Sequence, residues 1–338
     1  HGAFYRNKNG GTGMSTAKTT DKDFKQIWSN ITTNYSHWLS FILLMIVAVI
    51  INPSFLSVTN LTNQFVQGAI VGICAMGMSL VISAGMIDLS VGSSVALISG
   101  LGVSLLNKTH SITLCLLFCM GLGLLLALIN GIFITKGNIA PFIVTLATFS
   151  AYRSIITQLG QGGPFTVDKS MYDAFRYVAS GKIFGIPHLM IIFILITLLT
   201  GFIMAKTKFG RYVYAVGSNQ QAARLTGIKV GNVKTMIYCY AGILYGLAAF
   251  LLASRLTSIQ AASAGDGYEM DAIAAVAIGG TAMEGGRGKI IGTFLGVLML
   301  RIIQTILVMA NVPPFLNGLV RGLVIIVAVL AQSKKKHK

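Results

Sequence analysis

A break in the hydrophobic pattern decides the fold, and it reads Ser83-Ala84-Gly85-Met86-Ile87-Asp88-Leu89-Ser90-Val91-Gly92. It divides the apolar stretch 61–106, in which Asp88 is the only charged residue. The run on each side is close to the roughly 20 residues that a helix needs to cross a bilayer. We interpret the break as a tight connection at a membrane boundary. Asp88 is then placed to cap the second helix through the free N–H groups of its first turn.

Two features of the first half recur in the second half. Ser263-Ala264-Gly265 precedes another apolar run, and Gly265 follows Gly85 by 180 residues. The segment 138–142, Asn-Ile-Ala-Pro-Phe, resembles 311–315, Asn-Val-Pro-Pro-Phe, at an offset of 173 residues. Similar offsets predict a duplicated five-helix unit, and an odd number of crossings makes the two halves inverted. The alternative is a chance match of two short motifs.

The composition predicts an all-α, polytopic membrane protein. The 338 residues are 54% hydrophobic and 10% charged, whereas soluble domains carry about 25% charged residues. The apolar pattern indicates about ten transmembrane helices, which we place at 38–51, 61–84, 89–106, 111–135, 140–156, 187–205, 235–253, 270–282, 290–310 and 314–331.

The polar segments give the predicted domain boundaries. Residues 1–37 are interpreted as a tag remnant followed by a cytoplasmic segment, and 332–338 as a basic cytoplasmic tail. The transmembrane domain is 38–331, with halves at 38–156 and 187–331 and a basic loop at 206–234.

The basic residues predict the orientation. With both termini inside the cell, 18 Lys and Arg lie on the cytoplasmic side and six outside, as the positive-inside rule requires. The net charge of +17 is therefore interpreted as a membrane signal rather than as a nucleic-acid surface, because the sequence lacks the pattern of stacking aromatic and basic residues that is typical of single-strand binders.

Three acidic residues lie beside apolar runs: Asp88, Glu269 and Asp271. An ionisable group at membrane depth is costly, and it suggests a functional site. The alternative is helix capping at the interface. The spacing of Glu269 and Asp271 puts them on different helix faces, so at most one is expected to face a pore. For Arg301 the sequence leaves three possibilities open: a pore lining, a snorkelling side chain or a misplaced boundary.

Uncharged polar residues are the other candidates for a substrate path. A path for a sugar needs hydroxyl and amide groups rather than fixed charge. Such groups also hydrogen-bond neighbouring helices in membranes, so packing is the alternative role. Together with the three acids, the candidate path residues are Gln64, Gln67, Asp88, Ser90, Asn130, Thr145, Glu269 and Asp271.

The sequence predicts neither catalysis nor a bound cofactor. Gly288-Lys289 lacks the rest of the phosphate-binding motif G-x-x-x-x-G-K-[ST], and neither H-E-x-x-H nor G-x-S-x-G occurs. The four cysteines lie in apolar runs without nearby histidines, so we interpret them as packing residues rather than metal ligands. The chain is therefore expected to be neither an enzyme nor a metalloprotein.

The basic loop contains a predicted short amphipathic helix. Residues 217–228 read Gly-Ser-Asn-Gln-Gln-Ala-Ala-Arg-Leu-Thr-Gly-Ile, with a capping signal at Asn219 and a stop at Gly227. At 29 residues the loop is long for a simple connector. We expect the helix to dock a partner on the cytoplasmic face.

At these residues the chain resembles the permease subunits of bacterial ABC importers for ribose and related monosaccharides, within the branched-chain amino acid/ribose-type permease family. The similar stretches are 85–92, 217–228 and 267–288, and the resemblance covers residues 38–331. It implies a ten-helix permease in the bacterial inner membrane that works as a dimer, with a homodimer expected.

The resemblance also implies partners. A separate ATP-binding cassette subunit docks inside, and an extracytoplasmic sugar-binding protein delivers the substrate, with ribose as the best guess. Residues 217–228 then form the coupling helix, which places Asn219, Gln220, Arg224 and Gly227 at the cassette. The family commonly has Glu where this chain has Gln220, which puts one salt bridge in doubt. The alternative function is an ion-coupled secondary transporter with five-plus-five inverted repeats.

Overall fold

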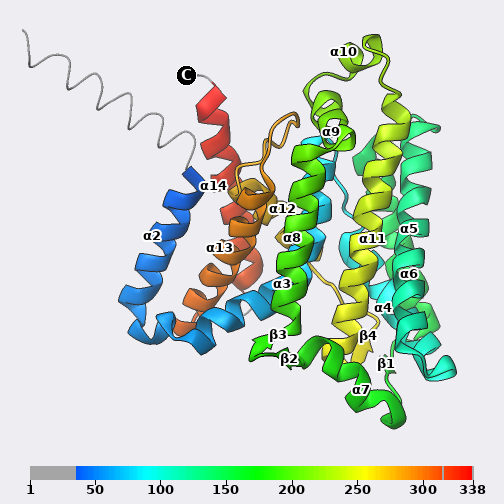
Figure 1. Ribbon diagram of the computed structural model, residues 1–338, viewed down its shortest axis with the longest axis vertical. Helices are drawn as coiled ribbons and strands as arrows, with labels where there is room; N and C mark the ends of the chain where they lie inside the picture. Colours follow the sequence, from blue (N-terminus) through cyan, green and yellow to red (C-terminus); the bar gives the residue numbers. More distant parts are fainter. Residues whose placement is uncertain (1–35, 314–315, 337–338) are drawn as a thin grey trace, which may run out of the picture.

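The computed structural model describes residues 36–313 and 316–336, and most of them are helical (Figure 1). The predicted tag remnant and nearly all of the N-terminal cytoplasmic segment lie outside the described residues, as do the last two residues of the basic tail. The elements are α2 (Ser36–Ile51), η1 (Pro53–Leu56), α3 (Val58–Ser83), α4 (Val91–Thr109), α5 (Ile112–Thr135), α6 (Pro141–Leu159), β1 (Pro164–Thr166), α7 (Lys169–Ser180), β2 (Lys182–Ile183), β3 (Ile186–Pro187), α8 (His188–Lys206), α9 (Lys208–Ser218), α10 (Gln220–Leu225), α11 (Val230–Leu256), β4 (Ser258–Gln260), α12 (Tyr268–Ile278), α13 (Ile290–Met309) and α14 (Asn317–Lys336).

Each predicted apolar segment coincides with a helix. Six of these helices, α3, α4, α5, α8, α11 and α13, are long and apolar enough to cross a membrane. The chain is therefore a multi-pass membrane protein. Helix α12 has 11 residues, about 17 Å at 1.5 Å per residue, which is too short to cross a bilayer core of about 30 Å alone.

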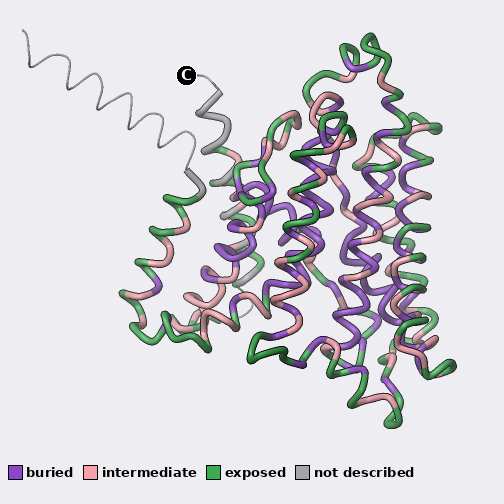
Figure 2. The backbone as a smooth tube through the Cα atoms, in the orientation of Figure 1, coloured by how far each residue is buried: buried purple, intermediate pink, exposed green. Residues whose placement is uncertain are grey.

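Helix α11 forms the centre of the bundle and packs against α3, α4 and α5. Its contact with α5 is made by small residues: a side chain at Gly242 would collide with the carbonyl oxygen of Gly123, and one at Gly246 with that of Cys119. Small residues let the backbones of membrane helices approach closely. The buried residues therefore concentrate in the middle of the bundle (Figure 2).

The outer surface of the bundle is apolar. Leu117 on α5, Leu198 on α8 and Val327 on α14 are each more than 60% exposed. A soluble protein rarely presents so much apolar surface, whereas lipid tails are as apolar as these side chains. This surface fits a protein that is surrounded by lipid.

The two ends of the bundle differ in structure. Helices α9 and α10 lie at one end, together with the start of α2 and the end of α14 (Figure 1). At the other end lie α7 and two short antiparallel sheets, β1 with β4 and β2 with β3. In the first sheet Phe165 pairs with Ile259, so strands far apart in sequence close this end.

Candidate functional site

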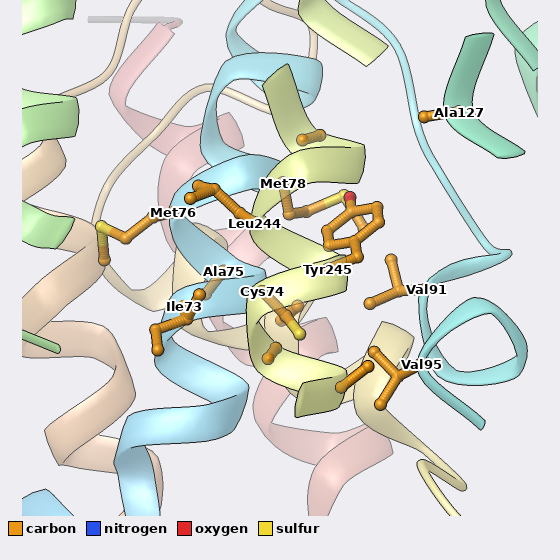
Figure 3. Packing of buried hydrophobic residues seen from close by; sticks show 14 of the residues in the cluster. Ile73, Cys74, Ala75, Met76, Met78, Val91, Val95, Ala127, Leu244 and Tyr245 are labelled. Atoms are coloured by element: carbon orange, nitrogen blue, oxygen red, sulfur yellow. The ribbon is translucent and has the colours of Figure 1, made fainter. Parts of the chain in front are cut away.

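The first break runs from Ala84 to Ser90 and carries the chain back into the bundle without helical structure. Val91, the first residue of α4, lies beside Tyr245 near the middle of α11 (Figure 3). The break is therefore more than a tight connection between two helix ends, because its seven non-helical residues, at roughly 3.3 Å each, return into the bundle before α4 begins.

Asp88 anchors this break, although not as we predicted. One carboxylate oxygen, Oδ1, accepts hydrogen bonds from the amide and the hydroxyl of Ser90, at 2.9 and 2.6 Å. Ser90 occupies the N-cap position of α4, and its side chain makes no capping bond. The prediction that Asp88 caps the first turn of α4 is wrong, because this carboxylate oxygen binds the residue two positions ahead in an Asx-type turn.

Two neighbouring helices hold the break in place. Asn130 of α5 donates a hydrogen bond from Nδ2 to the Ser90 hydroxyl, at 3.0 Å. Tyr238 of α11 donates to the carbonyl oxygen of Ile87, at 3.1 Å. Three predicted path residues, Asp88, Ser90 and Asn130, thus form one buried hydrogen-bonded chain.

The second break precedes α12 and depends on glycine. Gly265 and Gly267 have φ angles of +67° and +73°, which side chains other than glycine rarely adopt. Arg153 of α6 holds this segment, because its Nη1 donates to the carbonyl oxygens of Ala261 and Ala264, at 3.1 and 2.8 Å. The break is therefore fixed by backbone conformation and by one guanidinium group.

Glu269 and Asp271 lie in the first turn of α12, and both are buried. The partial positive charge at a helix N-terminus favours carboxylates there. The first turn of α12 is therefore a favourable place for both carboxylates.

The two breaks meet inside the bundle. A side chain at Gly92, in the first turn of α4, would collide with the carbonyl oxygen of Gly265 and approach the Glu269 carboxylate. The N-termini of α4 and α12 therefore lie together, as half-helices do at the centre of several transporter folds. We call this cluster the break site, and it consists of Asp88, Ser90, Gly92, Asn130, Gly265 and Glu269.

The break site offers hydroxyl, amide and carboxylate groups next to two helix N-termini. Such groups bind polar, uncharged molecules by hydrogen bonds. Among the described residues, no cluster of three His, Cys, Asp or Glu is arranged to hold a metal ion.

Three other predicted path residues lie elsewhere. Gln64 accepts a hydrogen bond from Thr305 of α13, at 3.1 Å, and so joins two helices. Gln67 is exposed although the helical spacing predicts that it shares a face with the buried Gln64. Thr145 donates to the carbonyl oxygen of Pro141 within its own helix, at 2.9 Å. The structure does not bring these residues into the break site.

Sequence reasoning missed two residues that hold the breaks, Arg153 and Tyr238. Both donate to backbone carbonyl oxygens, and such a bond leaves no motif in the sequence. Arg301, whose role the sequence left open, donates to Gln304 of its own helix at 2.8 Å.

The predicted short helix in the basic loop is confirmed as α10. Asn219 caps it by accepting a hydrogen bond from the amide of Ala222 at 3.0 Å, and Gly227 lies just beyond it with a φ of +82°. Arg224 is exposed, and Leu225 is 90% exposed. The helix therefore presents a charged and an apolar side chain outward at the end of the bundle.

Comparison with known proteins places the chain in a family. Residues 60–329 match the family model described as branched-chain amino acid transport system / permease component. The ribose import permease protein RbsC of Bacillus subtilis is 43% identical over 298 residues, which cover 88% of this chain and 92% of that protein. The L-arabinose transport system permease protein AraH of Escherichia coli is 31% identical over 96% of this chain and 97% of that protein.

A third relative is the xylose transport system permease protein XylH of Haemophilus influenzae, 29% identical over 88% of this chain and 97% of that protein. No solved structure matches the chain. The family model covers most of the chain, and the relatives are matched over almost their whole length. This chain belongs to the family of permease components of branched-chain amino acid transport systems.

Proposed function

We propose that this chain is the membrane-spanning permease subunit of an ATP-driven sugar importer and that its substrate is a monosaccharide, with ribose favoured. The observation that carries the proposal is the 43% identity to a ribose import permease over 92% of that protein. A break site with hydroxyl and amide groups suits a sugar, because a sugar is polar and carries no charge that a fixed counter-ion would have to match.

The proposed architecture is ten crossings in two inverted halves. Backbone geometry supports it at both pairs of sequence anchors, because Gly85 and Gly265 have φ angles of +73° and +67°, and Asn138 and Asn311 of +51° and +55°. Packing also supports it: α4 packs against α5 and α6, and α12 packs against α13 and α14. Inverted halves allow one half to rock against the other around a central path.

The proposed path passes the break site, where Asp88, Ser90, Asn130 and Glu269 offer hydrogen bonds to sugar hydroxyls. Asp271 lies two residues further along α12, and we keep it as a candidate lining residue. For Gln64, Gln67 and Thr145 we retain a path role only as a hypothesis, since Gln64 already bonds to α13 and Thr145 to the backbone of its own helix.

The proposed partners follow from the two ends of the bundle. A separate ATP-binding cassette subunit docks on α10 through Asn219, Gln220, Arg224 and Gly227, and it hydrolyses the ATP that this chain cannot. An extracytoplasmic sugar-binding protein delivers at the end that carries α7. A second copy of the chain completes the pore. The α10 end faces the cytoplasm of a bacterial cell, and both termini lie there.

Reconstitution tests this proposal. The chain is inserted in liposomes with its cassette and its binding protein, and uptake of radiolabelled ribose is followed with ATP inside. We expect uptake that requires ATP and both partners, with xylose and arabinose competing more weakly. Uptake by the chain alone, driven by a sodium or proton gradient, would instead establish the ion-coupled secondary transporter.

A further inference from the structure

Three segments that are far apart in sequence meet backbone to backbone at the α10 end of the bundle. They are the end of α3 with the start of the first break, the end of α9, and the connection from α12 to α13. We call their contact the glycine joint, and it consists of Ser83, Gly85, Gly217, Gly285 and Gly286. Four of the five are glycines, and each lies against backbone atoms of another segment.

Gly217 brings the end of α9 onto the end of α3. A side-chain carbon at Gly217 would overlap the carbonyl oxygen of Ser83 and lie 2.6 Å from the amide nitrogen of Gly286. Because these neighbours are backbone atoms, no change of rotamer relieves the overlap. Gly217 is two residues before Asn219, which caps α10, so the contact lies at the base of the proposed docking helix.

The connection from α12 to α13 closes the joint from the other side. The amide of Gly286 donates a hydrogen bond to the carbonyl oxygen of Ser83 at 2.8 Å. A side-chain carbon at Gly285 would lie 2.7 Å from the amide nitrogen of Gly85 and 3.0 Å from the carbonyl oxygen of Gly217. The φ angles of Gly85, Gly285 and Gly286, +73°, +91° and +76°, also favour glycine.

A side-chain contact reinforces the joint. The hydroxyl of Tyr214, one turn before Gly217 in α9, donates to the carbonyl oxygen of Gly288 at 2.7 Å. Burial raises the pKa of Tyr214, so its phenol keeps the proton that this hydrogen bond requires. Helix α9 is thus fastened to the α12–α13 connection at two points.

We propose that the glycine joint makes the base of α10, the first break and the α12–α13 connection move as one body. Asp88 and Ser90 follow Gly85 by three and five residues, so movement of α10 is passed to the break site through this short segment. The glycines are positioning residues, because they act on the break site through Ser83 and the chain that follows it. This inference rests on the proposed function.

Substitution of Gly217 tests the joint. We compare Gly217→Ala and Gly286→Ala with Gly231→Ala, a control on the same end whose nearest neighbour would be 3.8 Å from the new carbon. The measurements are co-purification with the cassette, ATP hydrolysis, and ribose uptake per ATP hydrolysed. We expect normal assembly and hydrolysis within twofold, with uptake per ATP reduced at least tenfold in the two joint variants only.

A cross-link gives a second test that does not depend on those variants folding. A carbon at Gly288 would lie 3.1 Å from the Ser83 hydroxyl oxygen, so Ser83→Cys with Gly288→Cys can form a disulfide once the Thr281 side chain rotates. If these segments move together, oxidation leaves uptake within twofold of the reduced protein. Loss of uptake that a reductant restores would overturn the proposal.

The outcomes separate this inference from the proposed function. If the unaltered complex shows no ATP-driven ribose uptake, the proposed function fails. If that complex is active and Gly217→Ala takes up as much ribose per ATP hydrolysed as Gly231→Ala, only the proposal of the glycine joint fails.

Discussion

Each of the two breaks is a non-helical segment that leads into a helix, α4 or α12, but different interactions hold the two in place. The first is held by side chains, through the chain of hydrogen bonds from Asp88 to Ser90 to Asn130. The second is held by glycine conformation and by Arg153, which binds two backbone carbonyl oxygens. The backbone N–H and C=O groups of a non-helical segment inside a membrane protein must form their hydrogen bonds within the protein. The comparison shows that a break in a helix can be held by a polar motif that the sequence reveals or by backbone interactions that it does not.

The contact between the breaks should be the most sensitive point. Gly92→Val would place carbon atoms against the carbonyl oxygen of Gly265 and the Glu269 carboxylate, and backbone atoms cannot move away cheaply. We expect ribose uptake to fall at least 100-fold, measured in proteoliposomes with both partners. Gly121→Val is the matched control, because its new side chain meets open space and should leave uptake within twofold. Equal activity of the two variants would contradict the close approach of α4 and α12.

The first break should depend on the acceptor at position 88 more than on its charge. Asp88→Ala leaves the amide and hydroxyl of Ser90 without their acceptor, and a buried donor left unsatisfied costs about 1–3 kcal/mol. We expect a loss of about 3 kcal/mol in unfolding free energy, measured by thermal unfolding in detergent. Asp88→Asn keeps an acceptor oxygen and should cost less than half as much. If Asn is as destabilising as Ala, the charge itself holds the break.

The second break should be less sensitive to loss of Arg153 than the first break is to loss of Asp88. Arg153→Ala removes two hydrogen bonds to backbone carbonyl oxygens, and we expect a cost of about 2 kcal/mol with uptake reduced about tenfold. Arg176→Ala on α7, an exposed arginine 5.9 Å from the Tyr172 ring, is the control for stability and should change the unfolding free energy little. An effect of Arg153→Ala larger than that of Asp88→Ala would reverse the comparison between the breaks.

The sequence predicted the helices better than it predicted the breaks. Apolar runs locate helices because burial in lipid or in the bundle requires them. The depth of the first break could not be predicted, because the length of an extended segment does not say whether it runs along the surface or back into the bundle. The meeting of Gly92 with Gly265 was equally hidden, since a glycine needed for close approach looks like any other glycine in the chain.

Part of the candidate site was predicted and part was not. Asp88, Ser90, Asn130 and Glu269 were selected as rare polar residues in apolar runs, and the structure brings them to the breaks. Gln64 was selected for the same reason, and it joins α3 to α13 instead. Composition identifies polar residues that need partners, but only the packing of helices decides which partners they find.

The most direct test of the account is reversal of the charge on α10. Arg224 is exposed on the six-residue helix that we propose as the docking point of the cassette. In Arg224→Glu we expect normal membrane insertion, lost co-purification with the cassette and lost ATP-driven ribose uptake, whereas Arg176→Glu at the other end retains insertion and co-purification with the cassette. Normal uptake by Arg224→Glu would contradict the claim that this chain is moved by ATP hydrolysis in a separate subunit docked on α10.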